Sequence, residues 1–469
     1  MSDRSSLLRR NLRLCTTDGL VATPIVYLLQ PGNFIIAALL TGLFRLPNEI
    51  YGIIVSLPFW GNFAQAFLMP FINRYFPPKT VTVVCATLQA LCWAALGVSL
   101  SWLPADRMAA SGQWFLGVFT VSAALTAFTG VSWTSWMQEW VPVRLRGKYF
   151  GMRNRLLQIA QFVFLIGVGQ LLARTASSVR AFQALILGSV GLRVASAVIQ
   201  HRIQAGAGKL RTEAQTSWRE QLQVLRRSPA FLWFMGYGAL WGFAANLFGP
   251  FYPVFMYQHL GWKPENLTWL VVLNSLGGAF SYPAWGALAD RFGNKPVMLF
   301  CMLVWQLENF SWCFLTPQNS WLLYSLWTFG GVIGAGGMVG AGFLLTFFNM
   351  QLKLIPPEAK TMAVSVNLAL TSLVTAIAPI LGGGLIDSFL RAGYEPMALY
   401  HRVFLVQPAL AILACALIVR IQEDKASPLS SVVGAMRNLR TLSAVMGISF
   451  IVDFIFVKPQ KSHDHHLDR

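Results

Sequence analysis

Charged residues are scarce in this sequence, and acidic ones are the scarcest. Only 12% of the 469 residues are Asp, Glu, Lys or Arg, about half the share of an ordinary soluble domain. A water-facing surface needs more charge than this, so the composition excludes a soluble enzyme of any fold. The 36 Lys and Arg residues outnumber the 18 acidic ones, but they lie in short stretches between apolar runs. That distribution argues against nucleic acid as a partner.

Paired cysteines and catalytic motifs are also lacking. The six cysteines show neither paired nor CxxC spacing and lie mostly inside apolar runs, which predicts small core residues and argues against a disulfide or zinc framework. Residues 206–210 lack the first glycine and the hydroxyl residue of a phosphate-binding loop. We therefore expect no enzymatic activity, no cofactor and no metal site, and a solvated histidine tail at 463–466.

Long apolar runs are what the sequence has instead. A helix of about 20 apolar residues crosses the hydrocarbon core of a membrane. Twelve such segments are predicted, and the fold class is all-α, a polytopic membrane protein. The segments are 19–44, 50–73, 80–105, 108–138, 156–173, 181–200, 228–262, 266–289, 296–315, the later part of 309–352, 361–386 and 403–419.

Loop charge predicts how these spans are oriented. If the loops are numbered alternately, those on one side carry 28 Lys and Arg residues and those on the other carry 7. Basic loops stay in the cytoplasm, so we expect both termini there and an even number of spans. The expected location is a bacterial inner membrane. We expect a multi-pass monomer whose partner is the lipid bilayer.

The two halves of the chain resemble each other. The distance from Pro47 to Arg74 is 27 residues, and so is the distance from Pro264 to Arg291. These pairs are offset by 217 residues, and a later pair is offset by 214. Such an offset predicts two pseudo-symmetric six-helix halves with a solute site between them. We expect a first half at 1–202, a linker at 203–228, a second half at 229–421 and a tail at 422–469.

The tail contains one more apolar stretch, at 442–457, which includes an aspartate. It is short for a span, so an interfacial helix is the interpretation. The alternative is a thirteenth span, which would place the C-terminus outside and violate the charge rule.

Residues 286–295 read GALADRFGNK. This segment resembles the G-x-x-x-D-R-x-G-x-K signature of the major facilitator superfamily, and residues 139–153 resemble the loop between the fourth and fifth spans of bacterial members. The resemblance implies two six-helix halves and transport by alternating access. It also implies that Asp290 and Arg291 help latch the two halves on the cytoplasmic side. The equivalent loop of the first half keeps the basic residues but has Asn73 where the signature has aspartate.

The resemblance implies which spans line the central cavity, and several of them carry polar or aromatic side chains. Uncompensated polar groups in hydrocarbon are unfavourable, so these side chains indicate either bonding between helices or contact with a solute. The candidate solute-binding residues are Gln30, Asn33, Gln65, Trp133, Gln158, Gln161, Trp241, Asn246, Asn274, Asn367 and Thr371.

A second set of residues is a candidate for gating or ion coupling. Glu308 is a carboxyl group inside a span and a candidate proton site, since such groups are rare and commonly functional. Charges near the cytoplasmic ends of the first, fourth and fifth spans are expected to form an ion-pair cluster that gates the cavity. That cluster consists of Asp18, Glu139, Arg146 and Arg155.

The sequence therefore predicts secondary active or facilitative transport of a small organic solute. The cavity has few buried charges, so a neutral or weakly charged solute is favoured over a strongly ionic one. H⁺ or Na⁺ is the candidate coupling ion. Two alternatives stay open: export of drugs or other amphiphiles, and a receptor or scaffold that transports nothing.

Overall fold

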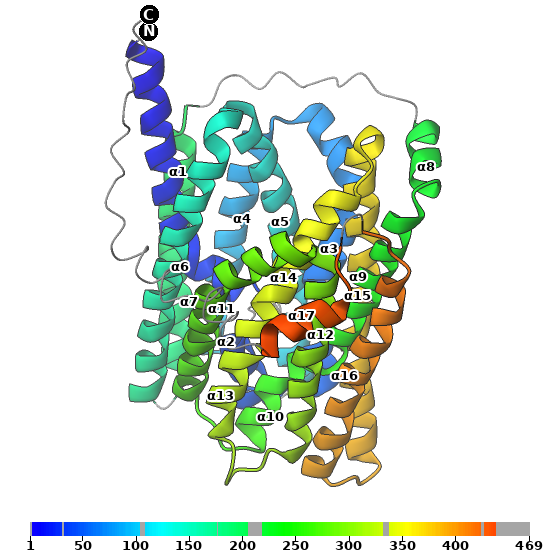
Figure 1. Ribbon diagram of the computed structural model, residues 1–469. Coiled ribbons are helices and arrows are strands. Elements are labelled where there is room, and N and C mark those ends of the chain that lie inside the picture. The colour runs from blue at the N-terminus through cyan, green and yellow to red at the C-terminus, as the bar shows by residue number, and fades with distance from the viewer. Residues whose placement is uncertain are drawn as a thin grey trace, which may run out of the picture.

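The computed structural model describes residues 2–30, 32–103, 108–175, 177–204, 218–331, 337–423 and 426–437. Within these ranges the chain is helical and contains no strand. Long helices run side by side between two ends of a bundle (Figure 1). We call the end where α1 begins the basic end, at the top of Figure 1, and the opposite end, near α10, the far end.

Two parts of the chain build the bundle. The N-terminal part, residues 2–204, contains α1 (Ser2–Leu28), α2 (Phe34–Ala37), a π-helix (Ala38–Leu43), α3 (Asn48–Tyr75), α4 (Pro78–Ser99), α5 (Met108–Trp140), α6 (Val143–Arg174) and α7 (Val179–Arg202). Each of the helices α3 to α7 covers one predicted span, because a long apolar run flanked by charge or proline sets its limits, whereas α1 covers only the start of the first span.

The C-terminal part, residues 218–437, contains the remaining helices. They are α8 (Trp218–Arg226), α9 (Pro229–Phe248), α10 (Tyr252–Gln258), α11 (Pro264–Phe292), α12 (Asn294–Asn309), α13 (Leu322–Phe329), α14 (Met338–Leu354), α15 (Lys360–Arg391), α16 (Pro396–Val419) and α17 (Leu429–Arg437). Short 3₁₀ segments lie at Gly249–Phe251, Phe310–Phe314 and Pro357–Ala359.

Eight helical segments among the described residues are long and apolar enough to cross a membrane alone. They coincide with the predicted third to seventh, ninth, eleventh and twelfth spans. The other four predicted spans differ in shape. The first is divided between α1, which ends at Leu28, and α2, which begins at Phe34. The tenth is divided between α13, which ends at Phe329, and α14, which begins at Met338, whereas α3 and α11 are continuous over 28 and 29 residues.

The first and seventh predicted spans are interrupted at corresponding places near the far end. α1 ends at Leu28 before α2 begins, and α9 ends at Phe248 before α10 begins. Gly32 has a positive φ of 68°, which suits glycine, and a Cβ there would lie 3.6 Å from Pro250. The two interruptions therefore pack against each other, and the largest apolar cluster of the molecule contains residues from both parts.

The segment after the last span contains a helix that the sequence did not indicate. α17 packs beside α12 and lies across the front of Figure 1. Its Val432 side chain is fully buried in an apolar cluster of the C-terminal part. The predicted interfacial helix at 442–457 and the histidines at 463–466 lie outside the described residues.

Candidate functional site

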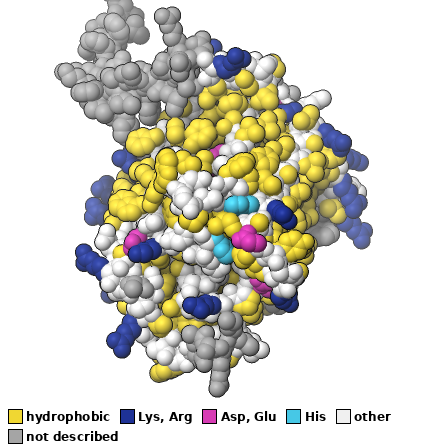
Figure 2. Space-filling model, turned by 90° about the horizontal axis from the view of Figure 1, so that it is seen from below, with side chains coloured by type: hydrophobic (Ala, Val, Ile, Leu, Met, Phe, Trp, Pro, Cys, Tyr) yellow, Lys and Arg dark blue, Asp and Glu magenta, His cyan; other side chains and the backbone are white. Residues whose placement is uncertain are grey.

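The two parts of the chain touch mainly at the far end. Six hydrogen bonds join described residues of one part to described residues of the other, and all six lie there. The residues of the N-terminal part in these bonds are Phe34, Thr41, Asn48, Glu49 and Tyr51, and their partners are Pro250, Tyr257, Gln258, Asp387 and Tyr400. Seen from this end, the molecule presents a continuous surface with histidine and acidic side chains near its middle (Figure 2).

Three of these bonds satisfy backbone carbonyls near the interruptions of the first and seventh spans. The Tyr257 hydroxyl donates to the Phe34 carbonyl at 3.1 Å, and the Tyr51 hydroxyl donates to the Pro250 carbonyl at 3.2 Å. Gln258 donates to the Thr41 carbonyl at 3.4 Å. Irregular helix leaves carbonyls without partners, so each part completes the backbone bonding of the other.

The helices α3 and α15 approach each other so closely that their backbones are almost in contact. A Cβ at Gly52 would collide with the carbonyl of Pro379, and a Cβ at Gly383 would collide with the carbonyl of Asn48. Small residues permit such approach between membrane helices. This end of the bundle is therefore closed by close packing as well as by hydrogen bonds.

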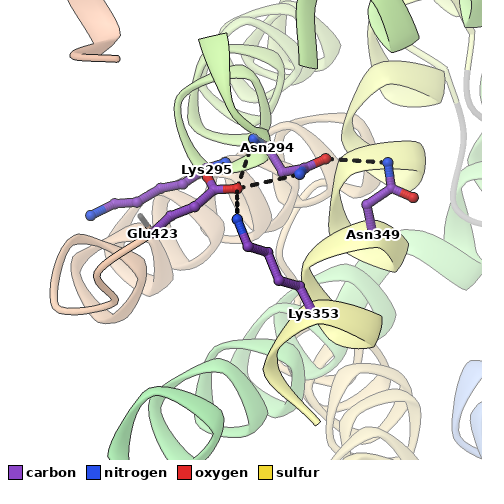
Figure 3. Close-up of polar contacts among 5 residues, drawn as sticks. All are labelled: Asn294, Lys295, Asn349, Lys353 and Glu423. Atoms are coloured by element: carbon purple, nitrogen blue, oxygen red, sulfur yellow. Dashed lines mark hydrogen bonds and ion pairs between the residues drawn. The ribbon is translucent and has the colours of Figure 1, made fainter. Parts of the chain in front are cut away.

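At the basic end, one acidic side chain gathers three segments of the C-terminal part (Figure 3). Glu423, which follows α16, accepts the backbone N–H groups of Asn294 and Lys295 at 3.2 and 2.7 Å, at the start of α12. The Lys353 ammonium lies 3.1 Å from the same carboxylate, in the one ion pair among the described residues. Asn294 also accepts a bond from Asn349 of α14.

Burial by itself would raise the pKa of Glu423, whose side chain is 2% exposed. The N–H donors of Lys295 and Asn294 and the Lys353 ammonium outweigh that effect and hold the pKa below its ordinary value. The carboxylate is therefore charged at neutral pH, and it caps the N-terminus of α12 where the helix dipole favours an anion.

In each half of the chain, one lysine side chain donates hydrogen bonds to backbone carbonyls at the end of another helix. Lys295 Nζ donates to the carbonyls of Val419 and Ile421, at 3.0 and 2.6 Å. Lys79 Nζ donates to the carbonyls of His201 and Ile203, at 3.1 and 2.8 Å. Each lysine starts a helix and binds the end of another, α16 or α7, as expected for a cation at a helix C-terminus.

The N-terminal part holds its charges deeper in the bundle. Asp18 of α1 is 2% exposed and accepts bonds from Ser196 at 2.6 Å and Gln200 at 3.0 Å, both on α7. Arg193, 4% exposed, donates to Ser196 at 3.4 Å. Arg153 of α6 donates to the Cys15 carbonyl at 3.3 Å.

The proposed ion-pair cluster of Asp18, Glu139, Arg146 and Arg155 is therefore not the arrangement seen. Asp18 bonds to the sixth predicted span, whereas Glu139 and Arg155 are exposed and the side chain of Arg146 is outside those described. The hydrogen-bond partners of Asp18 are thus ones that the sequence analysis did not name, and the gating role of the four residues stays a prediction.

The role of Asp290 and Arg291 as a latch between the two halves stays a prediction. Both side chains are exposed, and Arg291 stacks on the neighbouring Phe292 ring at 5.3 Å. The bonds of this loop are made instead by its last two residues, Asn294 and Lys295, and they stay within the C-terminal part.

Glu308 is buried as predicted, with 9% of its surface exposed. Neither carboxylate oxygen has a hydrogen-bond partner among the described residues, and the side chain lies against Gly330, where the tenth predicted span is interrupted. Its role as a proton site stays a prediction.

Some of the candidate solute-binding residues are occupied by local bonds. Asn33 caps α2 by accepting the N–H groups of Ile35 and Ile36, and it donates to three carbonyls. Asn246 donates to the Gly242 carbonyl of its own helix at 2.9 Å. These bonds favour a structural role for both amides.

The other candidates differ in exposure. Gln30 and Gln158 are exposed, Gln65 and Asn274 are buried, and five others are partly buried: Trp133, Gln161, Trp241, Asn367 and Thr371. Thr371 bonds to the Asn367 carbonyl one turn earlier at 2.6 Å, which fixes both on one face of α15.

Two of the aromatic candidates have ring partners. The Arg153 guanidinium lies 4.7 Å from the Trp133 ring centre, a cation–π contact. Trp241 of α9 packs against Phe343 and Phe347 of α14, with ring centres 4.8 and 5.6 Å away. Trp241, Phe343 and Phe347 thus form an aromatic cluster between two helices of the C-terminal part.

Asp387, Glu423 and Arg153 were not among the predicted site residues. Asp387 and Glu423 lie at the ends of spans, where the surrounding sequence does not indicate whether an acidic residue is exposed or bonded. The offset of 216 residues between Lys79 and Lys295 was the available signal for the basic end, because both begin a span in the repeat.

The sequence resembles known transporters over part of its length. The sequence model of the Major Facilitator Superfamily matches residues 238–457. A stretch of 179 residues is 24% identical to the multi-drug resistance efflux pump PmrA of Streptococcus pneumoniae, and it covers 37% of this chain and 40% of the pump. The chain thus matches less than half the length of that relative.

Solved structures share the fold over most of the chain. A mutant of the nucleoside transporter NupG gives a TM-score of 0.62 at 13% identity, covering 89% of this chain and all of that one. The xylose transporter XylE of E. coli gives 0.61 at 13% identity, covering 91% and 99%. A bacterial homologue of the lysosomal transporter Spinster gives 0.59 at 15% identity, covering 90% and 99%.

At these identities the structures establish the fold, and the sequence match establishes the relationship in the C-terminal part. The signature at 286–295 and the lysine shared by both halves agree with them. Residues 238–457 thus match the Major Facilitator Superfamily, and the chain over most of its length has the fold of solved transporters.

Proposed function

We propose that the chain moves a small, neutral or weakly charged organic solute across a bacterial inner membrane by alternating access. The moving bodies are two six-helix halves, 1–202 and 229–421, joined by the linker 203–228 and followed by the tail 422–469. The twelve apolar segments support twelve spans, and the 28-to-7 loop charge supports cytoplasmic termini and an even number of spans. The basic end is then cytoplasmic and the far end is the outer one.

One observation carries the mechanism. All six hydrogen bonds between described residues of the two parts lie at the far end, while the polar clusters of the basic end stay within one part. Among the described residues, hydrogen bonds thus join the parts at the far end only, as expected of a state that opens toward the cytoplasm. Alternation requires the far-end contacts to break and the basic-end surfaces to meet.

The polar faces of the fifth and eleventh spans support a solute site between the halves. Gln161, Asn367 and Thr371 are partly buried, so packing does not enclose them fully. Amide and hydroxyl groups suit sugars or nucleosides, which is consistent with the substrates named for the xylose and nucleoside transporters of the same fold.

Thermal unfolding of the purified protein with a panel of sugars, nucleosides, peptides and amphiphiles tests this site. A ligand at 100 times its Kd should stabilise the protein by about 2.7 kcal/mol. Gln161→Ala should abolish that shift. Gln170→Ala is the matched control, since its exposed side chain lies nine residues on and on the opposite face of α6. Loss of the shift in both variants, or in neither, would contradict the site.

Coupling to H⁺ is proposed as part of the same function, with the unpartnered Glu308 carboxylate as the candidate proton site. One solved structure of this fold is described as a D-xylose–proton symporter. Uptake of the identified solute should then move protons, measured as a pH change in lightly buffered vesicles, and Glu308→Gln should uncouple the two. Solute uptake without proton movement in the parent protein would favour facilitated diffusion or Na⁺.

Export of drugs or other amphiphiles is the second candidate function. It is favoured by the aromatic cluster of Trp241, Phe343 and Phe347 and by the partial likeness to an efflux pump. If only amphiphiles stabilise the protein, and Trp241→Ala removes their effect while Gln161→Ala does not, export replaces the neutral-solute proposal.

A further inference from the structure

The start of α3 has no cap from its own part of the chain. Its N-cap residue is Pro47, and no side chain of that residue bonds to the first turn. The first N–H groups of a helix lack intrahelical partners, and at α3 one of these groups is satisfied from the other part. Asp387 Oδ2, on α15, accepts the backbone N–H of Glu49 at 2.8 Å.

The same carboxylate also binds a side chain of that turn. Asp387 Oδ1 accepts a bond from Asn48 Nδ2 at 2.8 Å. The Tyr400 hydroxyl, on α16, donates to Asn48 Oδ1 at 3.3 Å. Two helices of the C-terminal part therefore bind one residue of the N-terminal part.

The local packing leaves the Asp387 carboxylate free for this contact. Arg391, one turn later, bonds to the backbone carbonyl of Asp387 and forms no ion pair with its carboxylate. Gly383, one turn earlier, lets α15 approach the Asn48 carbonyl. An anion at the N-terminus of a helix also gains from the helix dipole.

We propose that Asp387 is a positioning residue that latches the far end closed by capping α3 across the interface between the halves. It contacts no solute and acts through Asn48 and the first turn of α3. When α3 and α15 separate, both carboxylate oxygens lose their partners together. The latch thus favours the state closed at the far end, and the inference rests on the proposed alternation between states.

The test measures the access of an impermeant maleimide from each side of sealed vesicles. The first reporter is Ala378→Cys, whose parent side chain is fully buried on α15 near the Gly52–Pro379 contact. The second is Thr371→Cys, on the face proposed to line the cavity. The parent chain with its six cysteines and no reporter gives the background.

Asp387→Ala should raise labelling of the Ala378→Cys reporter from the far-end side by about tenfold or more, because hydrogen bonds to a charged group are stronger than average. Labelling of the Thr371→Cys reporter from the basic-end side should fall in the same variant. A rise from one side with a fall from the other marks a shift between states, whereas a merely loosened fold would raise both.

Glu49→Gln is the matched control. It alters the charge at the latch but keeps the backbone N–H that Asp387 binds, so its labelling should equal that of the parent. If Asp387→Ala fails to fold, Tyr400→Phe removes one bond of the latch and should give a smaller rise. A folded Asp387→Ala with unchanged labelling of Ala378→Cys would overturn the latch.

The two reporters separate failure of the latch from failure of the proposed function. If position 371 never reacts from the basic-end side, the proposed cavity is wrong, but the result at position 378 still decides the latch. If position 371 is labelled in the parent and Asp387→Ala leaves the labelling of position 378 unchanged, the cavity is supported and the latch is wrong.

Discussion

Each part of this chain places one buried carboxylate at its basic end, but in different surroundings. Asp18 lies between α1 and α7 and bonds to two neutral side chains, with Arg193 behind them. Glu423 lies after the last span and bonds to the start of α12 and to Lys353, which is 48% exposed. The first is an internal contact between helices and the second a surface clamp on a loop.

The difference concerns the environment of the charge. A charge inside a bundle is costly unless its partners are in place, and removal of one partner leaves the other uncompensated. A charge near water can recover hydration when its partners separate. We infer that the internal contact fixes α7 against α1 throughout the cycle, whereas the surface clamp can tolerate movement of its loop.

The largest expected effect is at the internal carboxylate. Asp18→Ala should lower the free energy of unfolding by about 3–5 kcal/mol, because Arg193 is left buried without an anion. Chemical unfolding in detergent measures this. The double variant Asp18→Ala with Arg193→Met should recover much of the loss. If the double variant is as unstable as the sum of the single ones, the two charges are not coupled.

The second effect is at the surface clamp. Glu423→Ala removes the acceptor of two backbone N–H groups and of Lys353, and it should lower the free energy of unfolding by about 1.5–3 kcal/mol. Glu358→Ala, at an exposed position near α15, is the control and should change it by less than about 0.5 kcal/mol. A loss at Glu423 larger than that at Asp18 would reverse the comparison.

The helices of both parts were predictable because their signal is local. The apolar windows 181–200 and 361–386 became α7 and α15, extended by a few polar residues at their ends. Long apolar stretches bounded by charge have few alternatives in a membrane. The interruption of the first span was less visible, since Asn33 appeared as a candidate ligand although it caps α2.

The contacts that join distant segments were not predictable. Asp387 binds a residue 339 positions away, and no spacing in one sequence reports such a pair. Asp18 was assigned to charges in nearby loops, but its partners are an uncharged serine and glutamine. Short polar residues within a span look alike in sequence whether they face a neighbour or a cavity, so only three-dimensional packing separates them.

The third effect is a pH dependence confined to the surface clamp. The pKa of Glu423 is held below its ordinary value. Its stabilising contribution is therefore complete above the pKa of the unfolded chain, about 4.5, and is lost as the pH falls through the lower folded pKa. Thermal unfolding of the parent and of Glu423→Gln should differ at neutral pH and converge in acid. A difference that grows in acid would show that the pKa is raised.

The smallest effect compares the two lysines that hold the span ends. Lys79→Met and Lys295→Met each remove two bonds to backbone carbonyls. The backbone N–H of Lys295 remains bound to Glu423, so the start of α12 keeps one bond to the segment after α16 when the ammonium is lost. Lys79→Met should therefore destabilise the protein by about 1 kcal/mol more than Lys295→Met, the contribution of one ordinary hydrogen bond. Combination of each with Glu423→Ala sharpens the test, because only the Lys295 pair should depart from additivity. Equal losses in the two single variants, together with additive losses in both double ones, would mean that the clamp does not support the lysine beside it.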